Sequence, residues 1–421
     1  MAKFVIEGKQ QLKGSIAVEG AKNHALKLIG ASVLSNQEMT IERVPDIEDV
    51  RRMLEILQAI GARVTHDNTA GIVHIDPSFV KSGTIPENTA GKIRSSTILM
   101  GPLLARFGKV DMSYPGGCLL GRRPIDLFLS GFEKMGARIK EGDDRLVIEA
   151  KKLKGAHIFM PIVSHTVTEA LMMAATLADG TTTIENAAVE PEVGALADYL
   201  NKQGAKISGA GSSVITIKGV SKLSAGTVTT IPDRLETATF ALLAAATKSN
   251  ITITDCDPAH VGALWSVFDK MGVPYELSKN SVKIKAAGKK TFASVPIRTH
   301  EYPGFPTDIQ APFTVLLTQC EGLSLVHETI FEGRLFYTDK LNRMGANIIL
   351  CDPHRAIVQG PTALRGKHLE SPDIRAGIGL IIAGLLAEGT TTIDNIYQVE
   401  RGYARIEERL SALGARIKRV S

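Results

Sequence analysis

The chain has 421 residues, 44% of them hydrophobic and 22% charged, which is typical of a large globular protein and excludes extensive disorder. This length exceeds one ordinary hydrophobic core, so we expect two domains of roughly 200 residues each. The net charge of +5 is mild, the basic residues are scattered, and only 5% of the residues are aromatic. These features argue against nucleic acid as a partner and favour small anionic ligands.

The cysteine spacing and the hydropathy indicate a reducing, cytoplasmic setting. The chain has four cysteines with no Cys-x-x-Cys pair and no histidine spacing suited to zinc, so we expect free thiols and no metal site. The first nine residues lack the apolar core of a signal peptide. The longest apolar stretch, twelve residues between Arg375 and Glu388, is too short to span a bilayer. We therefore expect a cytoplasmic protein without membrane insertion.

A repeat of about 70 residues runs through the whole chain. It becomes visible when the glycines that end amphipathic segments are aligned. These glycines are Gly61, Gly136, Gly204, Gly272, Gly345 and Gly414, which are 75, 68, 68, 73 and 69 residues apart. Six copies of one supersecondary unit therefore fill the chain, and so long a period is typical of closed pseudo-symmetric domains rather than of a solenoid.

Each unit begins with an apolar helix rich in small residues. We predict these helices over 21–34, 92–107, 164–178, 234–247, 307–320 and 373–387, and we expect them to be buried because they are apolar on all sides. A short strand rich in threonine and isoleucine follows, as at 180–186 and 389–395. A second, amphipathic helix then runs to the repeat glycine, as at 45–60, where proline and acids open it. A strand or hairpin comes next.

These six βαβ-type units predict the α/β fold class, with two domains of three units each and sheets wrapped around buried helices. We expect the boundary near Pro232, so that residues 22–231 form domain I and residues 1–21 with 232–421 form domain II. A predicted strand over 4–6 precedes the first buried helix, and we expect it to complete the third unit of domain II.

A glycine-rich, basic segment over 113–126 carries the most distinctive chemistry of the predicted first domain. Its three glycines permit unusual backbone angles, which is typical of a mobile loop or lid. Arg122 and Arg123 stand near Cys118 and favour anions, so this thiol is a candidate proton donor to an anionic substrate. The alternative is a surface turn around a buried cysteine.

Charged and polar side chains stand where the otherwise apolar helices begin. They are Lys22, Asn23, Lys92, Arg94, Ser164, His165, Arg234, Glu236, Asp308, Asp373 and Arg375. Capping of the first turn could account for Ser164, Asp308 and Asp373. It cannot account for the cations, because the amino end of a helix is itself positive. If the helix starts of the two domains face each other, these cations line an interdomain cleft that binds anions.

Several motifs together resemble one family of enolpyruvyl transferases. In chain order they are Gly20-Ala-Lys-Asn23, Pro115-Gly-Gly-Cys118, Gly121-Arg-Arg-Pro-Ile-Asp-Leu127, Pro232-Asp-Arg-Leu-Glu-Thr237, Phe305-Pro-Thr-Asp-Ile-Gln310 and Arg401-Gly-Tyr403. The chain resembles the UDP-N-acetylglucosamine 1-carboxyvinyltransferase family essentially from end to end. The resemblance implies transfer of enolpyruvate from phosphoenolpyruvate to the 3-hydroxyl of UDP-N-acetylglucosamine, with release of phosphate by addition and elimination. This is the first committed step of peptidoglycan biosynthesis.

The resemblance also implies the fold and the partners. The implied fold consists of two inside-out α/β domains of three repeats each, joined by a double crossover, with the active site in the interdomain cleft. The substrates are phosphoenolpyruvate and UDP-N-acetylglucosamine, and the chemistry requires no cofactor and no metal. The oligomeric state stays open.

The resemblance assigns roles to individual residues. Cys118 matches the loop cysteine that protonates the methylene carbon of phosphoenolpyruvate, and Asp308 matches the carboxylate at the sugar hydroxyl, the expected base. The matching phosphoenolpyruvate contacts are Lys22, Asn23, Cys118, Arg123 and Arg401, of which Lys22 and Arg401 also count as catalytic. The matching nucleotide-sugar contacts are Arg94, Arg123, Pro124, Ile125, Asp126, Leu127, Ile162, Val163, Ser164, His165, Asp308 and Ile330. Further polar residues of the expected cleft are Asp233, Glu236, Asp373 and Arg375.

Some positions depart from the family pattern. Ile162 stands where many relatives carry a basic residue, and His165-Thr166 replaces a small Val-Gly pair. The other departures are Phe128, Gln398 and Glu400. They bear on contact details and affinity rather than on the reaction.

Two other functions stay open. A 3-phosphoshikimate 1-carboxyvinyltransferase shares fold and chemistry, but its relatives usually have serine after the first lysine and lack the cysteine loop, so Asn23 and Cys118 argue against it. A catalytically silent binding module would not require all the catalytic residues to be intact. Arg334 could form a structural ion pair with Glu332, and we expect the three cysteines other than Cys118 to be packing residues.

Overall fold

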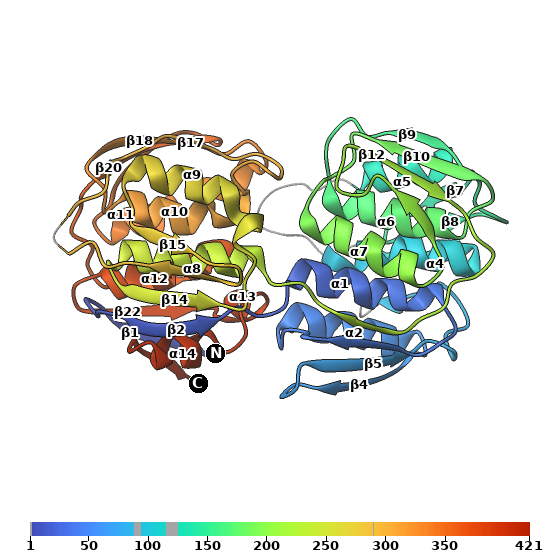
Figure 1. Cartoon of the computed structure of the whole chain (residues 1–421), viewed down its shortest axis with the longest axis horizontal. Coiled ribbons are helices and arrows are strands. Elements are labelled where there is room, and N and C mark those ends of the chain that lie inside the picture. Colours follow the sequence, from blue (N-terminus) through green and yellow to red (C-terminus); the bar gives the residue numbers. More distant parts are fainter. Residues whose placement is uncertain (1, 88–93, 115–124, 289) are drawn as a thin grey trace. The chain divides into compact units, whose positions relative to one another are not determined.

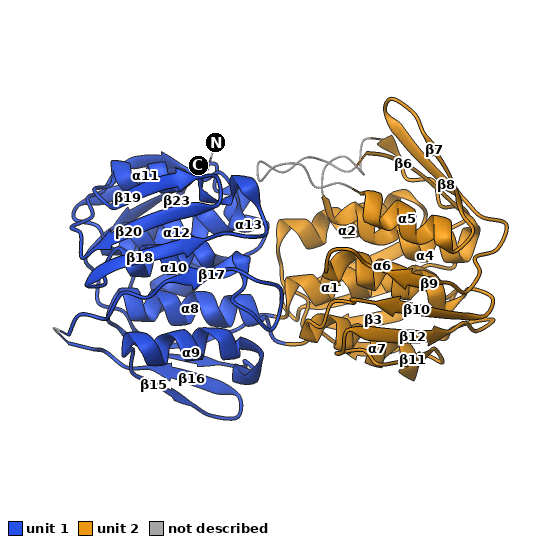
Figure 2. Ribbon diagram, turned by 90° about the horizontal axis from the view of Figure 1, so that it is seen from above, with its two compact units in different colours: residues 1–19, 119–121, 232–421 blue, residues 20–118, 122–231 orange. Residues whose placement is uncertain are grey.

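The structure is a computed structural model that describes residues 2–87, 94–114, 125–288 and 290–421. Apart from the undescribed residues 115–124, the chain divides into two compact units (Figure 2). Unit 1 comprises residues 2–19 and 232–421, and unit 2 comprises residues 20–231. The chain therefore passes from one unit to the other twice.

Unit 2 follows the repeated order of buried helix, strand, amphipathic helix and hairpin (Figure 1). Its helices are α1 (Lys22–Ala31), η1 (Ser32–Leu34), α2 (Glu48–Ala59), η2 (Arg94–Leu99), α4 (Met100–Phe107), α5 (Asp126–Lys134), α6 (His165–Thr176) and α7 (Pro191–Lys202). Its strands are β3 (Met39–Glu42), β4 (Arg63–Asp67), β5 (Ile72–Asp76), β6 (Lys109–Ser113), β7 (Arg138–Glu141), β8 (Arg145–Glu149), β9 (His157–Phe159), β10 (Thr181–Glu185), β11 (Lys206–Ser208), β12 (Val214–Lys218) and β13 (Thr227–Thr229).

Unit 1 repeats the same order. Its helices are α8 (Arg234–Ala246), η3 (Pro258–Val261), α9 (Gly262–Met271), η4 (Thr307–Ile309), α10 (Gln310–Leu317), η5 (Glu332–Leu335), α11 (Thr338–Arg343), α12 (Ile374–Leu386), α13 (Tyr397–Glu400) and α14 (Ile406–Ala412). Its strands are β1 (Lys3–Glu7), β2 (Lys13–Ala17), β14 (Asn250–Thr254), β15 (Tyr275–Leu277), β16 (Ser281–Ile284), β17 (Ile297–Arg298), β18 (Gly322–His327), β19 (Asn347–Asp352), β20 (Arg355–Gly360), β21 (His368–Glu370), β22 (Thr390–Asp394) and β23 (Arg416–Val420).

The sheets share one plan. Each four-stranded sheet has one parallel pair and two antiparallel pairs, as in the order β11-β12-β10-β9, where β9 runs parallel to β10. In the three-stranded sheet β6-β8-β7, a single parallel bridge from Thr84 to Asp111 stands in place of the parallel strand. One supersecondary unit therefore recurs throughout the chain, as the glycine spacing predicts.

The sheets surround helices that are apolar on every side. In unit 1 these central helices are α8, α10 and α12, and every residue of α8 is buried. In unit 2 they include α4 and α6, which approach so closely that a Cβ on Gly101 would lie 2.1 Å from the Ala170 carbonyl oxygen. The predicted α/β fold class with buried helices is thereby confirmed. Within the described ranges, every helix is too short or too polar to cross a membrane.

At each passage of the chain, the strand that precedes the first helix of one unit belongs to a sheet of the other unit. Strand β2 precedes α1 of unit 2 in the sequence, but it pairs in parallel with β14 of unit 1. Strand β13 precedes α8 of unit 1, but it pairs in parallel with β3 of unit 2. At the amino terminus, β1 lies between β22 and β23 and is antiparallel to both. The two sheets of unit 1 that contain β1 and β2 therefore combine amino-terminal residues with residues that follow Pro232.

The six repeat glycines share a left-handed backbone. Their φ angles are +110°, +88°, +101°, +75°, +104° and +97° at Gly61, Gly136, Gly204, Gly272, Gly345 and Gly414. A residue with a Cβ is strained in this region, whereas glycine ends a helix there without strain. The spacing of about 70 residues between these glycines therefore marks the one position in each unit where the left-handed backbone favours glycine.

Replacing one of these glycines should lower stability even where space is open. A Cβ on Gly204 would meet nothing within 4 Å, so Gly204→Ala tests the backbone alone, and we expect a loss of about 1–2 kcal/mol in the free energy of unfolding. The matched control is Gly194→Ala within α7, also with open space, which should stabilise by about 0.5–1 kcal/mol. Urea unfolding followed by circular dichroism measures both, and equal effects would contradict the backbone explanation.

Candidate active site

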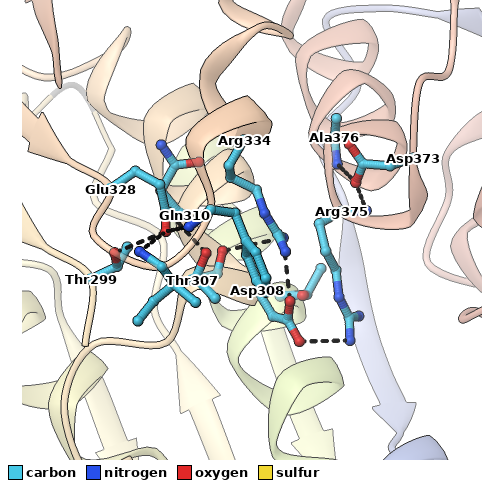
Figure 3. A network of polar contacts seen from close by, with 12 residues as sticks. Thr299, Thr307, Asp308, Gln310, Glu328, Arg334, Asp373, Arg375 and Ala376 are labelled. Atoms are coloured by element: carbon cyan, nitrogen blue, oxygen red, sulfur yellow. Dashed lines mark hydrogen bonds and ion pairs between the residues drawn. The ribbon is translucent and has the colours of Figure 1, made fainter. Parts of the chain in front are cut away.

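An aspartate held by two buried arginines is the centre of a polar network in unit 1 (Figure 3). Asp308 lies in η4, at the start of the buried helix α10. Its Oδ1 is 3.2 Å from Arg334 Nη1, and its Oδ2 is 3.2 Å from Arg375 Nη2. The arginine side chains are 2% and 9% exposed, whereas that of Asp308 is 27% exposed. The guanidinium groups are thus fixed inside the unit, and the carboxylate is the group that a ligand can reach.

Arg375 is held from several sides. Burial alone would lower the pKa of Arg375, but Asp308, Tyr403 and Asp233 outweigh it and raise this pKa above its usual value. Its Nη1 donates to the Tyr403 hydroxyl at 3.3 Å, and burial raises the pKa of Tyr403, so the phenol stays protonated. Arg375 is therefore a permanent cation in the first turn of α12.

Asp373 caps the helix that carries Arg375. Its Oδ1 accepts from the backbone N–H groups of Arg375 at 2.8 Å and Ala376 at 3.1 Å (Figure 3). Two other predicted site residues are helix caps as well. The Asp233 carboxylate accepts from two first-turn amides of α8, and the Ser164 hydroxyl accepts from the N–H group of Val167 in α6. Asp308 differs, because both of its oxygens are engaged by arginine side chains.

Glu328 fixes the loop beside Asp308. Its buried carboxylate accepts from the Thr299 hydroxyl at 3.1 Å and the Thr307 hydroxyl at 2.8 Å. It also accepts from the backbone N–H groups of Ile330 at 2.9 Å and Phe331 at 3.1 Å. Four donors satisfy a buried carboxylate well. Glu328 therefore ties Thr307, the neighbour of Asp308, to the loop that presents Ile330.

In unit 2, a lysine at the start of α1 is paired with an acid at the start of α2. Lys22 Nζ lies 2.6 Å from Asp49 Oδ2, and these side chains are 11% and 2% exposed. A cation at a helix start opposes the helix dipole, and the carboxylate of Asp49 compensates for this. Asn23 is half-buried beside Lys22, and Arg94 is half-buried at the start of η2.

A second buried charge pair lies deeper in unit 2. Lys27 Nζ on α1 is 3.1 Å from Glu169 Oε2 on α6, with side chains 2% and 0% exposed. His24, one turn before Lys27, is 1% exposed and accepts from Ile231 N through Nδ1. Burial lowers the pKa of His24 to about 4, against the opposing fields of Glu169 and Glu192. His24 is thus neutral inside the folded unit.

The remaining predicted site residues are placed as follows. Arg401 ends α13 and donates to Gln398 Oε1 at 3.1 Å. Glu236 binds Arg409 at 2.7 Å and accepts from Glu19 N at 3.0 Å, where the chain passes between the units. Ile125 is the buried N-cap residue of α5, followed by exposed Asp126 and half-buried Leu127; Ile162 is exposed and Val163 half-buried. Cys118, Arg123 and Pro124, like Lys92 and Arg122, lie outside the described residues.

Several residues of these clusters were missed by the sequence analysis. Asp49 was interpreted only as one of the acids that open a helix, and its pairing with Lys22 depends on the packing of α1 against α2. Arg334 was left open as a partner of Glu332, but it binds Asp308. Glu328 stands in a loop with no periodic signal. A buried lysine such as Lys27 on an apolar helix was a usable signal, because an unpaired charge cannot stay there.

The thiols of unit 1 differ among themselves. Burial raises the pKa of Cys256 to about 11 and that of Cys320 to about 12, so both are inert packing residues as expected. The expectation was wrong for Cys351, which is exposed on β19, next to a register shift between Leu350 and Asp352. Among the described residues, no group of three His, Cys, Asp or Glu side chains is placed to hold a metal ion.

The neutral state of His24 predicts a pH dependence of stability. His24 binds a proton near pH 6.5 in the unfolded chain and only near pH 4 in the folded chain. Because the unfolded chain binds this proton more readily, the free energy of unfolding falls as the pH drops from 6.5 to 4. We expect wild type to lose on the order of 3 kcal/mol more than His24→Gln between pH 7 and pH 4. Urea unfolding of wild type and His24→Gln at several pH values measures this dependence. Parallel profiles for wild type and His24→Gln would contradict it.

Comparison with known sequences identifies the relatives of this chain. A sequence model of the EPSP synthase family, described as 3-phosphoshikimate 1-carboxyvinyltransferase, matches residues 6–410. The chain is 43% identical over 420 residues to a UDP-N-acetylglucosamine 1-carboxyvinyltransferase of Desulforapulum autotrophicum. It is 44% identical over 420 residues to the enzyme of the same name from Magnetococcus marinus. Both alignments cover 100% of this chain and 100% of the relative.

Solved structures share the fold. The enolpyruvyl transferase NikO from Streptomyces tendae matches with a TM-score of 0.91 at 24% identity, over 100% of this chain and 99% of that chain. EPSP synthase from Acinetobacter baumannii matches with a TM-score of 0.73 at 20% identity, over 100% of both chains. The chain therefore belongs to the EPSP synthase family and, within it, to the relatives named UDP-N-acetylglucosamine 1-carboxyvinyltransferase, which confirms the resemblance of its motifs.

Proposed function

We propose that this chain transfers the enolpyruvyl group of phosphoenolpyruvate to the 3-hydroxyl of UDP-N-acetylglucosamine and releases phosphate, the first committed step of peptidoglycan biosynthesis. The names of relatives that align over the full length support this activity. The observation that carries it is the reachable carboxylate of Asp308 fixed between two buried guanidinium groups. The free thiols of Cys256, Cys320 and Cys351 are consistent with a cytoplasmic location of the protein.

The reaction needs an acid, a base and fixed cations. In the addition step, the sugar oxygen bonds to C2 of phosphoenolpyruvate while C3 gains a proton and the hydroxyl loses one. In the elimination step, C3 loses a proton, the C2–O bond to phosphate breaks, and the enol double bond re-forms. No electron is gained or lost overall, so acid–base catalysis and electrostatic stabilisation carry the reaction. We assign the acid to Cys118 and the base to Asp308.

The two arginines orient Asp308 for this role. With Oδ1 and Oδ2 each bound by a different guanidinium, the carboxylate plane is fixed while about a quarter of the side chain stays exposed. A positioned base contributes about 10²–10⁴-fold to a rate. Arg334 and Arg375 also supply positive charge near the reacting hydroxyl, where the intermediate gathers negative charge.

The phosphoenolpyruvate contacts are assigned to Lys22, Asn23, Arg123 and Arg401. The Lys22 ammonium is positioned by Asp49, which limits its conformations before substrate binds. The nucleotide-sugar contacts are assigned to Arg94, Arg123, Pro124, Ile125, Asp126, Leu127, Ile162, Val163, Ser164, His165 and Ile330. For Ile330, support comes from Glu328, which fixes the backbone of this loop.

Phosphate release with two acceptors separates this function from its closest rival. We expect wild type to release phosphate from phosphoenolpyruvate with UDP-N-acetylglucosamine and not with shikimate 3-phosphate. Cys118→Ala should abolish or strongly reduce the release, because the proton donor to C3 is lost. Cys351→Ser, at the exposed thiol, is the control and should retain activity. Release with shikimate 3-phosphate would move the chain to the rival transferase, and no release with either acceptor would leave a binding module.

Removing the charge of Asp308 should slow the chemical step. Asp308→Asn keeps the shape and one oxygen acceptor but cannot take the hydroxyl proton, so we expect kcat to fall about 10²–10⁴-fold. Asp352→Asn is a matched control, because Asp352 pairs with Arg355 on an exposed hairpin of the same unit. Steady-state kinetics measures both variants. A kcat for Asp308→Asn within about threefold of wild type would exclude Asp308 as the base.

A further inference from the structure

One sheet of unit 1 has an apolar outer surface. In the sheet β17-β18-β20-β19, Leu325 on β18 is opposite Ile357 on β20, which is in turn opposite Ile349 on β19. Leu323 lies two residues before Leu325 and therefore on the same face. Leu323, Leu325 and Ile349 are 65%, 41% and 61% exposed, and Ile357 is half-buried. We call the surface formed by these four side chains the aliphatic face.

The repeated unit shows that leucine is not required at these positions. Each of three equivalent strands follows a glycine with a left-handed backbone. The segments are Gly180-Thr-Thr-Thr-Ile-Glu185 at β10, Gly389-Thr-Thr-Thr-Ile-Asp394 at β22 and Gly322-Leu-Ser-Leu-Val-His327 at β18. Leu323 and Leu325 thus stand where the other two strands carry threonine. Threonine satisfies a strand and tolerates water, whereas a contiguous exposed apolar patch is typical of a surface that binds another protein.

One end of the aliphatic face also lacks the acid of the equivalent sheets. In those sheets the acid that ends the strand pairs with a histidine of the parallel neighbour, as Glu185 does with His157 at 3.0 Å. In β18 the same position is His327, and the residue opposite it on β17 is Arg298. In the described parts of the chain, no acid forms an ion pair with either residue. This end of the face is therefore cationic.

The other end of the face carries the opposite charge. Glu321 directly precedes β18, is exposed and has no ion-pair partner among the described residues. It is separated from the cationic end by the six residues of β18, which span about 20 Å. Arg355, opposite His327, adds little net charge, because it is bound to Asp352 at 2.6 Å. The face thus has an aliphatic centre between a free anion and a free cation.

The edge of this sheet is closed to a further strand at Ile348. The side chain of Asn342 donates to the Ile348 carbonyl oxygen at 2.8 Å and accepts from the Ile348 N–H group at 2.9 Å. These are the backbone groups that an added strand would have to bind at the outer side of β19. A partner is therefore expected on the face of the sheet and not along its edge.

We propose that the aliphatic face binds the same face of a second copy of this chain, with the strands of the two sheets antiparallel. A flat sheet face is complementary to another flat sheet face, and two such faces pack about 10 Å apart with their strands aligned within about 30°. In the antiparallel arrangement, Arg298 of each copy lies over Glu321 of the other. A two-fold axis then gives two equivalent ion pairs around an apolar centre.

The size of the face sets the strength of this contact. Four strands of about six residues cover roughly 400 Å² per copy, about half of what a stable interface buries. We therefore expect a weak, reversible dimer. This inference goes beyond the proposed function and uses none of the residues assigned to it, so either can fail without the other.

The concentration dependence of the molecular mass tests the association. Sedimentation velocity of the full-length wild type between about 1 and 200 µM should show a monomer–dimer equilibrium, with a Kd on the order of 10 µM. A monomer throughout this range would overturn the proposal and leave the aliphatic face to a partner of another kind.

Replacing the two leucines by the threonines of the equivalent strands tests where the copies meet. We expect Leu323→Thr/Leu325→Thr to raise the Kd at least about tenfold, because four leucines in each dimer lose their burial. The matched control Val214→Thr/Leu277→Thr changes exposed apolar residues on β12 and β15 and should keep the wild-type Kd. Circular dichroism and urea unfolding at low concentration show whether each variant is folded. A wild-type Kd for the leucine variant would contradict the proposal.

Exchanging the two end charges tests the antiparallel arrangement. Arg298→Glu and Glu321→Arg each place like charges opposite each other at both ends of the dimer, so each should raise the Kd about three- to tenfold. The double variant Arg298→Glu/Glu321→Arg restores opposite charges, and we expect its Kd to return to within about threefold of wild type. Additive losses in the double variant would show that these residues do not meet and would overturn the antiparallel dimer.

Discussion

The constraint on which this structure depends is the burial of helices that are apolar on every side. Sheets cover the flanks of α8, α10 and α12, so a charged residue in the middle of one of them would need a partner inside the core. Polar groups can stand at the helix starts, where unpaired N–H groups and solvent are available. Asp308 and Lys22, two of the residues assigned to catalysis, accordingly lie in first turns.

The charges that do lie inside come with partners on other elements. Lys22 pairs with Asp49 of α2, and Asp308 is bound from η5 and α12. A buried pair contributes little net stability, because desolvation offsets the attraction between its members. What it does provide is a fixed position, since each member loses its freedom to turn. In an enzyme that must align two substrates, fixed positions account for roughly 7–11 kcal/mol of the barrier.

The parts of the structure that were predictable follow from local rules. The repeat glycines could be found because a left-handed backbone admits few other residues, and the central helices because apolar residues fill all their faces. The candidate positions of Asp308 and Arg375 follow from their place in the first turns. The contacts of Arg334 and Asp49 were not predictable, because each joins segments whose approach depends on tertiary packing. No spacing along the chain encodes that approach.

Six copies of one unit also explain how a single scaffold accommodates several roles. Every unit has a repeat glycine with a left-handed backbone and a buried apolar helix. Because these features are common to all units, they cannot give the first turn of one buried helix a different role from that of another. The distinction lies in one or two residues per helix start: lysine in α1, histidine in α6, aspartate in η4 and arginine in α12. Substrate preference can therefore change through these residues while the core stays intact, except where the first-turn residue is tied to a buried partner. Around His165, such a change would have to include Lys27 and Glu169 together.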